Sequence, residues 1–344
     1  MQARTDGTAA SAAARGDLQQ PEQALAMPDA VEVTHATTRY RSVDVGELKI
    51  FYREAGAAHA PVLLLLHGFP SSSRMFDTLL PLLASDYRLV APDYPGFGHS
   101  DAPDAHHFAY TFDHLAQVIE RFTDAVGLTH YFLFVQDYGG PIGFRHAMAR
   151  PERVRGLIVQ NAVAHEEGLG PAWESRRAYW NDRRHHETRV MTAFMSLEGA
   201  RTRHVGHSPN VDRYNPDTWN DEFAALSRPG QDRIQADLFY DYRTNVASYP
   251  AWQAWLREHQ PPVLVLWGRF DASFTVDGAT AYSRDLPNAE VHLLDAGHFA
   301  LDEAVDEIAA LVRRFVDARL AHDEAERGAT LLLESQLSLA LLAE

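Results

Sequence analysis

The sequence predicts an α/β protein built on a mainly parallel, eight-stranded sheet with helices on both faces. Three observations favour this fold class. Short, continuous apolar runs recur along the chain, which is typical of strands buried on both faces. Segments with helical spacing of apolar residues lie between these runs, and such alternation builds βαβ units. One interval, residues 163–260, breaks the alternation and is expected to form a separate layer.

The apolar runs define the expected strands in chain order. Residues 31–45 and 47–56 have the pattern of two antiparallel strands, and residues 61–66 form the most continuous apolar run. Five similar runs follow, at residues 87–92, 131–136, 154–158, 263–267 and 291–294. Helical spacing of apolar residues appears at 115–126 and 308–315, and a helix is expected at 141–148.

Residues 163–260 are polar, aromatic and helix-like, and they contain five of the six tryptophans. This composition predicts a helical cap inserted at one end of the sheet, so that residues 31–162 and 261–320 form the core. An enlarged packing layer on the core is the alternative.

The two ends of the chain have different compositions. Residues 1–30 are rich in Ala, Gln and Gly without periodicity, which predicts a disordered tail. Residues 321–344 form an extension whose leucine-rich end, residues 331–344, is too short to span a membrane. It is expected to be an added helix that docks on the core or on a partner, and a homodimer stays possible.

The composition limits the classes of partner and cofactor. A net charge of -16 argues against nucleic acid and anionic membranes as partners. The absence of cysteine excludes disulfides, thiolate metal sites and cysteine catalysis. No cofactor or metal is expected, and the adjacent pair His185 and His186 is interpreted as solvated surface. The N-terminal segment has no apolar signal-peptide core, so a cytoplasmic location is expected.

An acidic residue stands where an apolar run meets two glycines, in the stretch F-V-Q-D-Y-G-G at residues 134–140. A strand, a tight turn with small residues and a helix form the elbow that presents a nucleophile above a sheet. Serine usually occupies the centre of that turn, whereas this chain has Asp137. A carboxylate is ionised at neutral pH and attacks an electrophilic carbon directly, which leaves an ester on the enzyme.

Hydrolysis of such an ester requires a general base, and His298 follows the last expected strand. Asp271 follows the preceding strand and is expected to accept the other imidazole N–H, which fixes the tautomer. The chain order of nucleophile, acid and histidine is itself a specific signal. Asp277 and Asp295 are alternative choices for the acid.

Two backbone amides are expected to stabilise the oxyanion that forms on the ester of Asp137. One is the N–H of Tyr138, the residue after the nucleophile. The other is the N–H of Phe69 in the H-G-F-P loop, residues 67–70, after the third strand. Pro70 has no N–H and stiffens this loop.

These motifs make the chain, from about residue 35 to 320, resemble the α/β-hydrolase superfamily in its branch with an aspartate nucleophile. That branch contains epoxide hydrolases and haloalkane dehalogenases, and the resemblance implies a helical cap after the sixth strand. The matching motifs are H-G-F-P (67–70), D-Y-P-G-F-G-H-S (93–100), Q-D-Y-G-G (136–140), W-G with Asp271 (267–271) and G-H-F (297–299).

The resemblance to epoxide hydrolases rests on the cap. Residues 240–245, Y-D-Y-R-T-N, are similar to a cap segment of that family whose tyrosine protonates the opening ring. This similarity implies Tyr242 as the ring-opening donor, and Tyr179 is the best placed second donor. Packing tyrosines with satisfied hydroxyls are the alternative.

The resemblance to haloalkane dehalogenases is incomplete. Those enzymes hold the halide with the tryptophan after the nucleophile, where this chain has Tyr138, and Phe69 offers no side-chain donor. A cap tryptophan, Trp173 or Trp180, would supply only part of a halide site. Val135 and Gln136, which precede the nucleophile, are nevertheless more similar to the corresponding residues of some dehalogenases. Fluoroacetate-type dehalogenases share H-G-F-P but carry an arginine after the nucleophile.

The sequence thus favours a cofactor-independent hydrolase that converts a small apolar epoxide and water into a diol. A haloalkane dehalogenase is the main alternative. A ligand-binding protein without turnover is a further alternative, and Asp137 argues against a serine esterase.

Overall fold

A computed structural model describes residues 37–341, with side chains described up to residue 330. The expected N-terminal tail, residues 1–30, therefore lies outside the described residues. Residues 31–36 of the first expected strand and residues 342–344 lie outside them as well.

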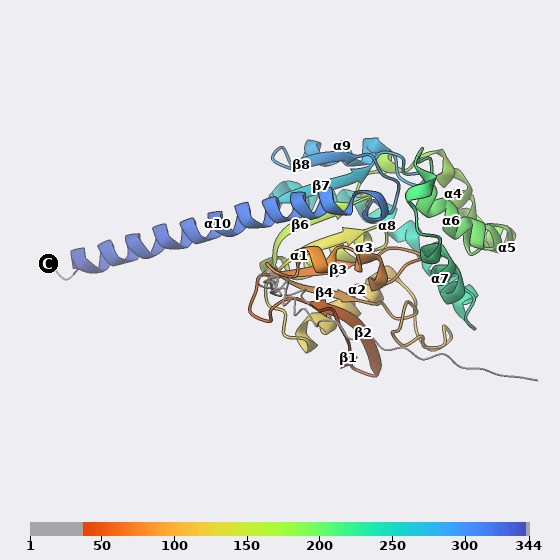
Figure 1. Ribbon diagram of the computed structural model, residues 1–344, viewed down its shortest axis with the longest axis horizontal. Helices are drawn as coiled ribbons and strands as arrows, with labels where there is room; N and C mark the ends of the chain where they lie inside the picture. The colour runs from red at the N-terminus through yellow and green to blue at the C-terminus, as the bar shows by residue number, and fades with distance from the viewer. Residues whose placement is uncertain (1–36, 342–344) are drawn as a thin grey trace, which may run out of the picture. The chain divides into compact units, whose positions relative to one another are not determined.

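The sheet has eight strands in the order β1-β2-β4-β3-β5-β6-β7-β8, which confirms the predicted fold class (Figure 1). β1 and β2 pair with each other antiparallel, β2 also pairs antiparallel with β4, and every later neighbour pair is parallel. The strands are β1 (Arg39–Val45), β2 (Leu48–Ala55), β3 (Val62–Leu66), β4 (Arg88–Pro92), β5 (Tyr131–Gln136), β6 (Val154–Gln160), β7 (Val263–Gly268) and β8 (Glu290–Leu294). Each lies within about two residues of its predicted run, apart from the start of β1.

The sheet is buried on both faces, which explains why its central strands read as continuous apolar runs. Successive side chains of a strand point to opposite faces. Accordingly, Leu64 and Leu66 of β3 pack in one hydrophobic cluster, whereas Leu63 and Leu65 pack in the other. The first cluster includes residues of α2 (Phe112–Ala125), α3 (Gly139–Ala149) and α9 (Val276–Asp285). The second includes residues of α1 (Leu80–Leu83) and α10 (Leu301–Leu341).

The helix α2 shows how local sequence fixes an element of this core. Thr111 caps its N-terminus, since its side-chain oxygen accepts a hydrogen bond from the His114 N–H at 3.2 Å. Its apolar residues lie on one face and are buried, including Leu115, Ile119 and Phe122. Burial of each such side chain contributes about 1.5–3 kcal/mol, so the predicted periodicity is also the energetic basis of the packing.

The interval between β6 and β7 is helical, as predicted. Its α-helices are α4 (Glu174–Asn181), α5 (Arg183–Phe194), α6 (Leu197–Val205), α7 (Pro216–Leu226) and α8 (Gln231–His259). α8 also contributes to the core, because Trp252 stacks on Phe144 of α3 at a centroid distance of 5.2 Å. The second half of α8 therefore serves as a packing layer of the core, while α4 to α7 precede it in the cap.

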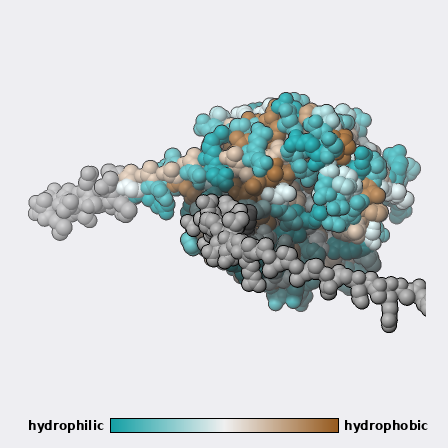
Figure 2. Space-filling view, in the orientation of Figure 1, coloured by the Kyte–Doolittle hydropathy of each residue, from teal (hydrophilic) through white to brown (hydrophobic). Residues whose placement is uncertain are grey.

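The expected C-terminal extension continues α10 rather than forming a separate helix. α10 is 41 residues long, with one non-helical residue at Ala304, and most side chains at 321–330 are exposed. No helix within residues 37–341 is long and apolar enough to cross a membrane. Hydrophilic residues dominate the face in Figure 2, with hydrophobic residues among them.

Candidate active site

Asp137 occupies the tight turn between β5 and α3. Its φ of 48° lies in the left-handed region, which few residues other than glycine adopt without strain. The Gly140 N–H donates to the Asp137 carbonyl at 2.9 Å and closes the turn. A Cβ atom on Gly139 would lie 2.1 Å from the Leu66 carbonyl oxygen, so this turn requires glycine there. The sequence F-V-Q-D-Y-G-G thus folds as the predicted elbow and aims the carboxylate out of the sheet.

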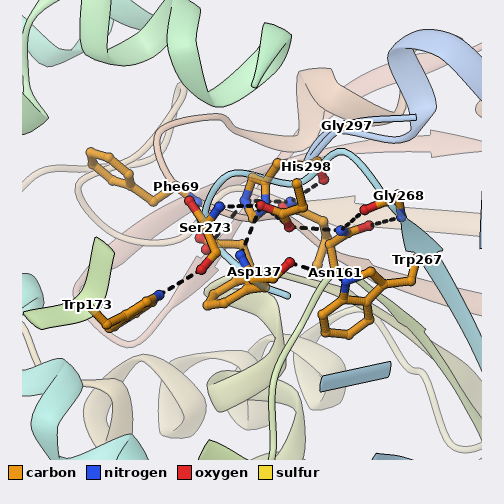
Figure 3. A network of polar contacts seen from close by, with 12 residues as sticks. Phe69, Asp137, Asn161, Trp173, Trp267, Gly268, Ser273, Gly297 and His298 are labelled. Atoms are coloured by element: carbon orange, nitrogen blue, oxygen red, sulfur yellow. Dashed lines mark hydrogen bonds and ion pairs between the residues drawn. The ribbon is translucent and has the colours of Figure 1, made fainter. Parts of the chain in front are cut away.

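The loops after β7 and β8 bring Asp271 and His298 to Asp137, and Figure 3 shows His298 beside Asp137. His298 Nδ1 lies 2.7 Å from an oxygen of Asp271, a hydrogen-bond distance. His298 Nε2 lies 3.6 Å from Oδ2 of Asp137. The imidazole is therefore oriented by one carboxylate and faces the other, which is the arrangement that the sequence predicts for an acid, a base and a nucleophile.

The two alternative acids lie elsewhere. Asp277 is exposed in the first turn of α9. Asp295 pairs with Arg269 at the surface, at 3.1 Å.

Asp271 is held by three further donors, none of which the sequence reasoning named. The N–H groups of Ser273 and Phe274 donate to Oδ1 at 2.6 and 3.0 Å. The Asn161 amide donates to Oδ2 at 2.8 Å, and its carbonyl oxygen accepts from the Gly268 N–H at 2.9 Å. Asn161 follows β6 with a φ of 41°. Its position after a buried strand was the signal that would have indicated a role.

The predicted oxyanion donor Phe69 already contacts the nucleophile. Its N–H donates to Oδ1 of Asp137 at 2.8 Å. The loop approaches the elbow closely: a Cβ atom on Gly68 would lie 2.0 Å from Gln136 Oε1 and 2.5 Å from Asp137 Cβ. The glycine of H-G-F-P therefore lets this loop reach the elbow. The Tyr138 N–H as second oxyanion donor stays a prediction.

The charge state of His298 depends on its two carboxylate neighbours. Burial alone would lower the pKa of His298, but Asp271 and Asp137 together raise it to about 9. At neutral pH the imidazole is therefore protonated. The Gln136 amide nitrogen also lies 3.1 Å from Nε2, so this side chain borders the same ring.

A small chamber of about 20 Å³ is lined by the nucleophile. This volume suffices for about one water molecule. Its walls combine the loops of the core with the cap helices and are mostly aromatic. The lining residues are Phe69, Asp137, Tyr138, Trp173, Arg176, Phe194, Arg203, Phe239, Tyr242, Ser273, Phe274 and His298.

Two tyrosine hydroxyls at this chamber make no close hydrogen bond with the described residues, although one of them, that of Tyr242, has the Tyr249 hydroxyl as a neighbour. They belong to Tyr242, which the sequence indicated as the ring-opening donor, and to Tyr138. Burial raises the pKa of both well above the ordinary value, so both hydroxyls are protonated and able to donate. Tyr138 therefore has a side-chain donor in addition to the backbone N–H that the sequence predicts as an oxyanion donor.

The structure does not bring Tyr179 to the chamber. Its hydroxyl donates to the Ala236 carbonyl at 2.9 Å and to Glu187 at 3.2 Å, and its ring packs on Phe239 and Tyr240. The geometry therefore supports Tyr179 as a packing residue of the cap and not as a second ring-opening donor.

The cap tryptophans offer no free donor to the chamber. The indole N–H of Trp173 donates to the Ser273 carbonyl at 2.8 Å (Figure 3), and that of Trp180 donates to the Phe239 carbonyl at 2.9 Å. A halide would have to compete with these bonds.

Two cap arginines that the sequence reasoning missed also line the chamber. Arg176 of α4 lies over the Trp173 ring, 4.2 Å from its centroid, and Arg203 of α6 lies 4.0 Å from the centroid of Phe194. Neither forms an ion pair among the described residues, and one terminal nitrogen of each is buried without a partner. Polar segments such as E-S-R-R gave no local signal that one arginine would face inward.

Comparisons with known proteins agree with this fold. The family model described as alpha/beta hydrolase fold matches residues 61–305. A Saccharomyces cerevisiae protein described as an uncharacterized hydrolase is 38% identical over 282 residues, which cover 80% of this chain and 97% of the yeast protein.

Haloalkane dehalogenases appear in both sequence and structure comparisons. The enzyme of Bradyrhizobium diazoefficiens is 44% identical over 112 residues, or 33% of this chain and 35% of that enzyme. A loop variant of the haloalkane dehalogenase DbeA from Bradyrhizobium elkanii superposes with a TM-score of 0.70 at 22% identity. The superposition covers 84% of this chain and 100% of that one, and at this identity it supports the fold alone. The family match and the nearly full-length yeast relative identify this chain as a member of the α/β-hydrolase family.

Proposed function

We propose that the chain is a cofactor-independent hydrolase that forms an alkyl ester on Asp137, and that its substrates are epoxides, which it converts to diols. The observation that carries this proposal is the position of Asp137 on the elbow. One carboxylate oxygen accepts from the Phe69 N–H, and the other faces the imidazole that Asp271 orients. A carboxylate in the place of the usual serine attacks carbon and needs no base for that step.

In the first step, an oxygen of Asp137 attacks an epoxide carbon and the bond from that carbon to the ring oxygen breaks. The negative charge that develops on the ring oxygen requires a proton. Tyr242 has a protonated, unpartnered hydroxyl at the chamber and donates it, which forms the alcohol. Tyr138 supports the same oxygen as a second donor, in the role that the sequence reasoning gave to Tyr179.

In the second step, His298 activates water against the ester. Esterification removes the negative charge of Asp137, one of the two charges that raise the pKa of His298. The imidazole then loses its proton more readily, and that proton restores the Tyr242 hydroxyl. The neutral imidazole accepts a proton from water, which attacks the ester carbonyl. The Phe69 and Tyr138 amides hold the oxyanion. When it collapses, the bond from the ester carbonyl to the substrate oxygen breaks, His298 protonates that oxygen and the diol leaves. The new carboxyl group of Asp137 then returns its proton to His298.

Haloalkane dehalogenation is the second candidate, because named relatives are haloalkane dehalogenases. The first attack and the ester hydrolysis would be the same. The difference lies in the leaving group, since a halide ion needs N–H donors. The indole N–H groups of Trp173 and Trp180 already donate to backbone carbonyls and are not free to bind a halide, which favours the epoxide reaction.

The test of the covalent mechanism uses His298→Gln and intact-mass spectrometry. Without its base the second step stalls, so the variant is expected to gain the mass of the substrate on Asp137 within one turnover. An epoxide adds its full mass, whereas a haloalkane adds its alkyl group and releases halide, so the same experiment separates the two reactions. Absence of an adduct with both substrate classes would overturn the covalent mechanism for them.

A further inference from the structure

The chamber gathers hydrogen-bond donors, most of them from the cap, that have no acceptor among the described residues. Tyr138 and Tyr242 contribute hydroxyls, and Arg176 and Arg203 contribute one buried terminal nitrogen each. All four residues line the chamber above Asp137. A buried polar group without a partner costs about 1–3 kcal/mol, and more when it is charged. Such a group in a native site points to a missing ligand.

The two arginines differ from other arginines of this chain that are largely buried. Arg53 pairs with Asp77 at 2.8 Å, and Arg88 pairs with Glu54 at 2.7 Å. Arg176 and Arg203 have only aromatic faces against them, apart from one bond from Arg203 to the Phe194 carbonyl at 2.7 Å. A guanidinium offers a planar fork of donors that matches the two oxygens of a carboxylate.

The balance of charge at the chamber also favours an anion. Three groups that carry positive charge, those of His298, Arg176 and Arg203, lie beside the two carboxylates of Asp137 and Asp271. This local excess occurs in a chain whose net charge is -16. Burial and the neighbouring Arg176 lower the pKa of Arg203 to about 10, which still leaves it charged at neutral pH. A monoanionic ligand would neutralise the chamber.

The same arginines border a second, larger cavity of about 830 Å³ in the cap. Arg176, Arg203, Phe194, Phe239 and Ser273 line both spaces and form the wall between them. A molecule that enters through the large cavity would thus meet both guanidinium groups before it reaches the nucleophile.

We propose that the substrate carries a carboxylate next to its electrophilic carbon, and that Arg176 and Arg203 bind this carboxylate while Asp137 attacks the carbon. This inference rests on the proposed function and narrows its substrate class to small acids. The two positive charges also offset the repulsion between the substrate carboxylate and the Asp137 carboxylate, which must approach within bonding distance of the neighbouring carbon. Tyr242 remains the donor to the leaving oxygen.

The experiment compares an acid with its neutral analogue of the same carbon skeleton. The substrates are trans-2,3-epoxybutanoate and trans-2,3-epoxybutan-1-ol, and diol formation gives kcat/KM for each. We expect the wild-type protein to prefer the acid by about tenfold to a hundredfold, as hydrogen bonds to a charged group predict. Arg203→Met and Arg176→Met, which keep the apolar part of the side chain, should lose most of this preference, because kcat/KM falls more for the acid than for the alcohol.

Arg184→Met is the matched control, because Arg184 is an exposed arginine of the cap outside both cavities. It should leave the preference unchanged. Should either methionine variant unfold, Arg203→Lys retains the charge without the fork and is expected to show an intermediate preference. An equal loss for acid and alcohol in both arginine variants would overturn the inference, since the arginines would then serve the leaving group or the fold.

Failure of the two hypotheses can be told apart. Wild-type protein that hydrolyses the alcohol as well as the acid would overturn the anion site and leave the epoxide reaction standing. Protein that hydrolyses neither epoxide would overturn the epoxide reaction. In that case calorimetric titration with butanoate still tests the site, because binding that Arg203→Met weakens about tenfold or more supports it. Absence of butanoate binding would overturn it.

Discussion

The core side and the cap side of the chamber differ in how well their polar groups are satisfied. On the core side, Asp137 accepts from Phe69, Asp271 accepts from Asn161 and two backbone amides, and His298 is fixed by Asp271. On the cap side, Tyr242, Arg176 and Arg203 have donors without an acceptor among the described residues, and Tyr138 of the elbow adds a fourth. A satisfied network holds reacting groups in place, whereas unsatisfied donors gain their bonds from a ligand. Under the proposed function, the core side carries out the reaction and the cap side selects the molecule that undergoes it.

The largest expected effect comes from removing the proposed nucleophile on the core side. Asp137→Asn keeps a side chain that tolerates a positive φ but removes the nucleophile. Turnover should fall by at least about 10⁴-fold, because residues that act as one catalytic unit lose nearly all activity when one is removed. The measurement is diol formation with freshly purified protein, whose mass confirms that the amide is intact. Asp295→Asn, which changes an exposed carboxylate in the loop that carries His298, should retain full activity.

The second prediction separates activity from stability on the cap side. Tyr242→Phe should slow epoxide opening about 100-fold, since general acid catalysis contributes about 10²–10⁴. The same variant should be at least as stable as the wild type, because its hydroxyl has no partner to lose. The measurements are single-turnover kinetics and the free energy of unfolding.

Tyr282→Phe is the matched control for stability. The hydroxyl of this buried tyrosine donates to the Ala162 carbonyl at 2.8 Å, so its removal should cost about 1 kcal/mol. If both variants lost the same stability, Tyr242 would have a structural partner and the contrast between the two sides would fail.

A smaller effect is expected at Asn161, which holds Asp271 but does not itself line the chamber. Asn161→Gly tolerates the positive φ but removes the hydrogen bonds to Asp271 and to the Gly268 N–H. We expect kcat to fall about tenfold, which corresponds to about 1.4 kcal/mol of transition-state stabilisation, with KM nearly unchanged. An unchanged kcat with a lower free energy of unfolding would instead limit Asn161 to a structural role.

The smallest effect concerns the dependence of stability on pH. The pKa of His298 is raised from 6.5 to about 9 in the folded protein. Its contribution to the free energy of unfolding is therefore complete below pH 6.5 and is lost as the pH rises through 9. Asp137→Asn removes one of the two carboxylates that raise this pKa, so the loss between pH 6.5 and 9 should be smaller in that variant.

Chemical denaturation across this pH range gives the difference between the two proteins, and an NMR titration of the imidazole gives the pKa directly. An unchanged pKa in Asp137→Asn would contradict the coupling between ester formation and the base.

The sequence predicted the core side well because its signals are local. Apolar runs gave the strands, and the residues directly after β5, β7 and β8 gave Asp137, Asp271 and His298. Parallel strands end at one edge of a sheet, so residues distant in the chain could be expected to meet there. Only Asn161 was missed, since it follows β6 without a motif around it.

The cap side could not be predicted to the same depth. Tyr179 and Arg176 lie on the same short helix, yet one packs on α8 and the other faces the chamber. The rotation of such a helix depends on packing against neighbours far along the chain, and its polar sequence does not specify an inward face. Tyr242 was predicted only because a recognisable motif surrounds it.

The small volume above the nucleophile has a kinetic consequence. A space of about 20 Å³ admits a water molecule but no organic acid or epoxide, so the wall of Phe194, Phe239 and the two arginines must part in every cycle. Motions of this kind take microseconds to milliseconds and often limit turnover. The rate would then depend on solvent viscosity, and once the wall recloses, the ester would be hydrolysed by water confined with it rather than by bulk solvent.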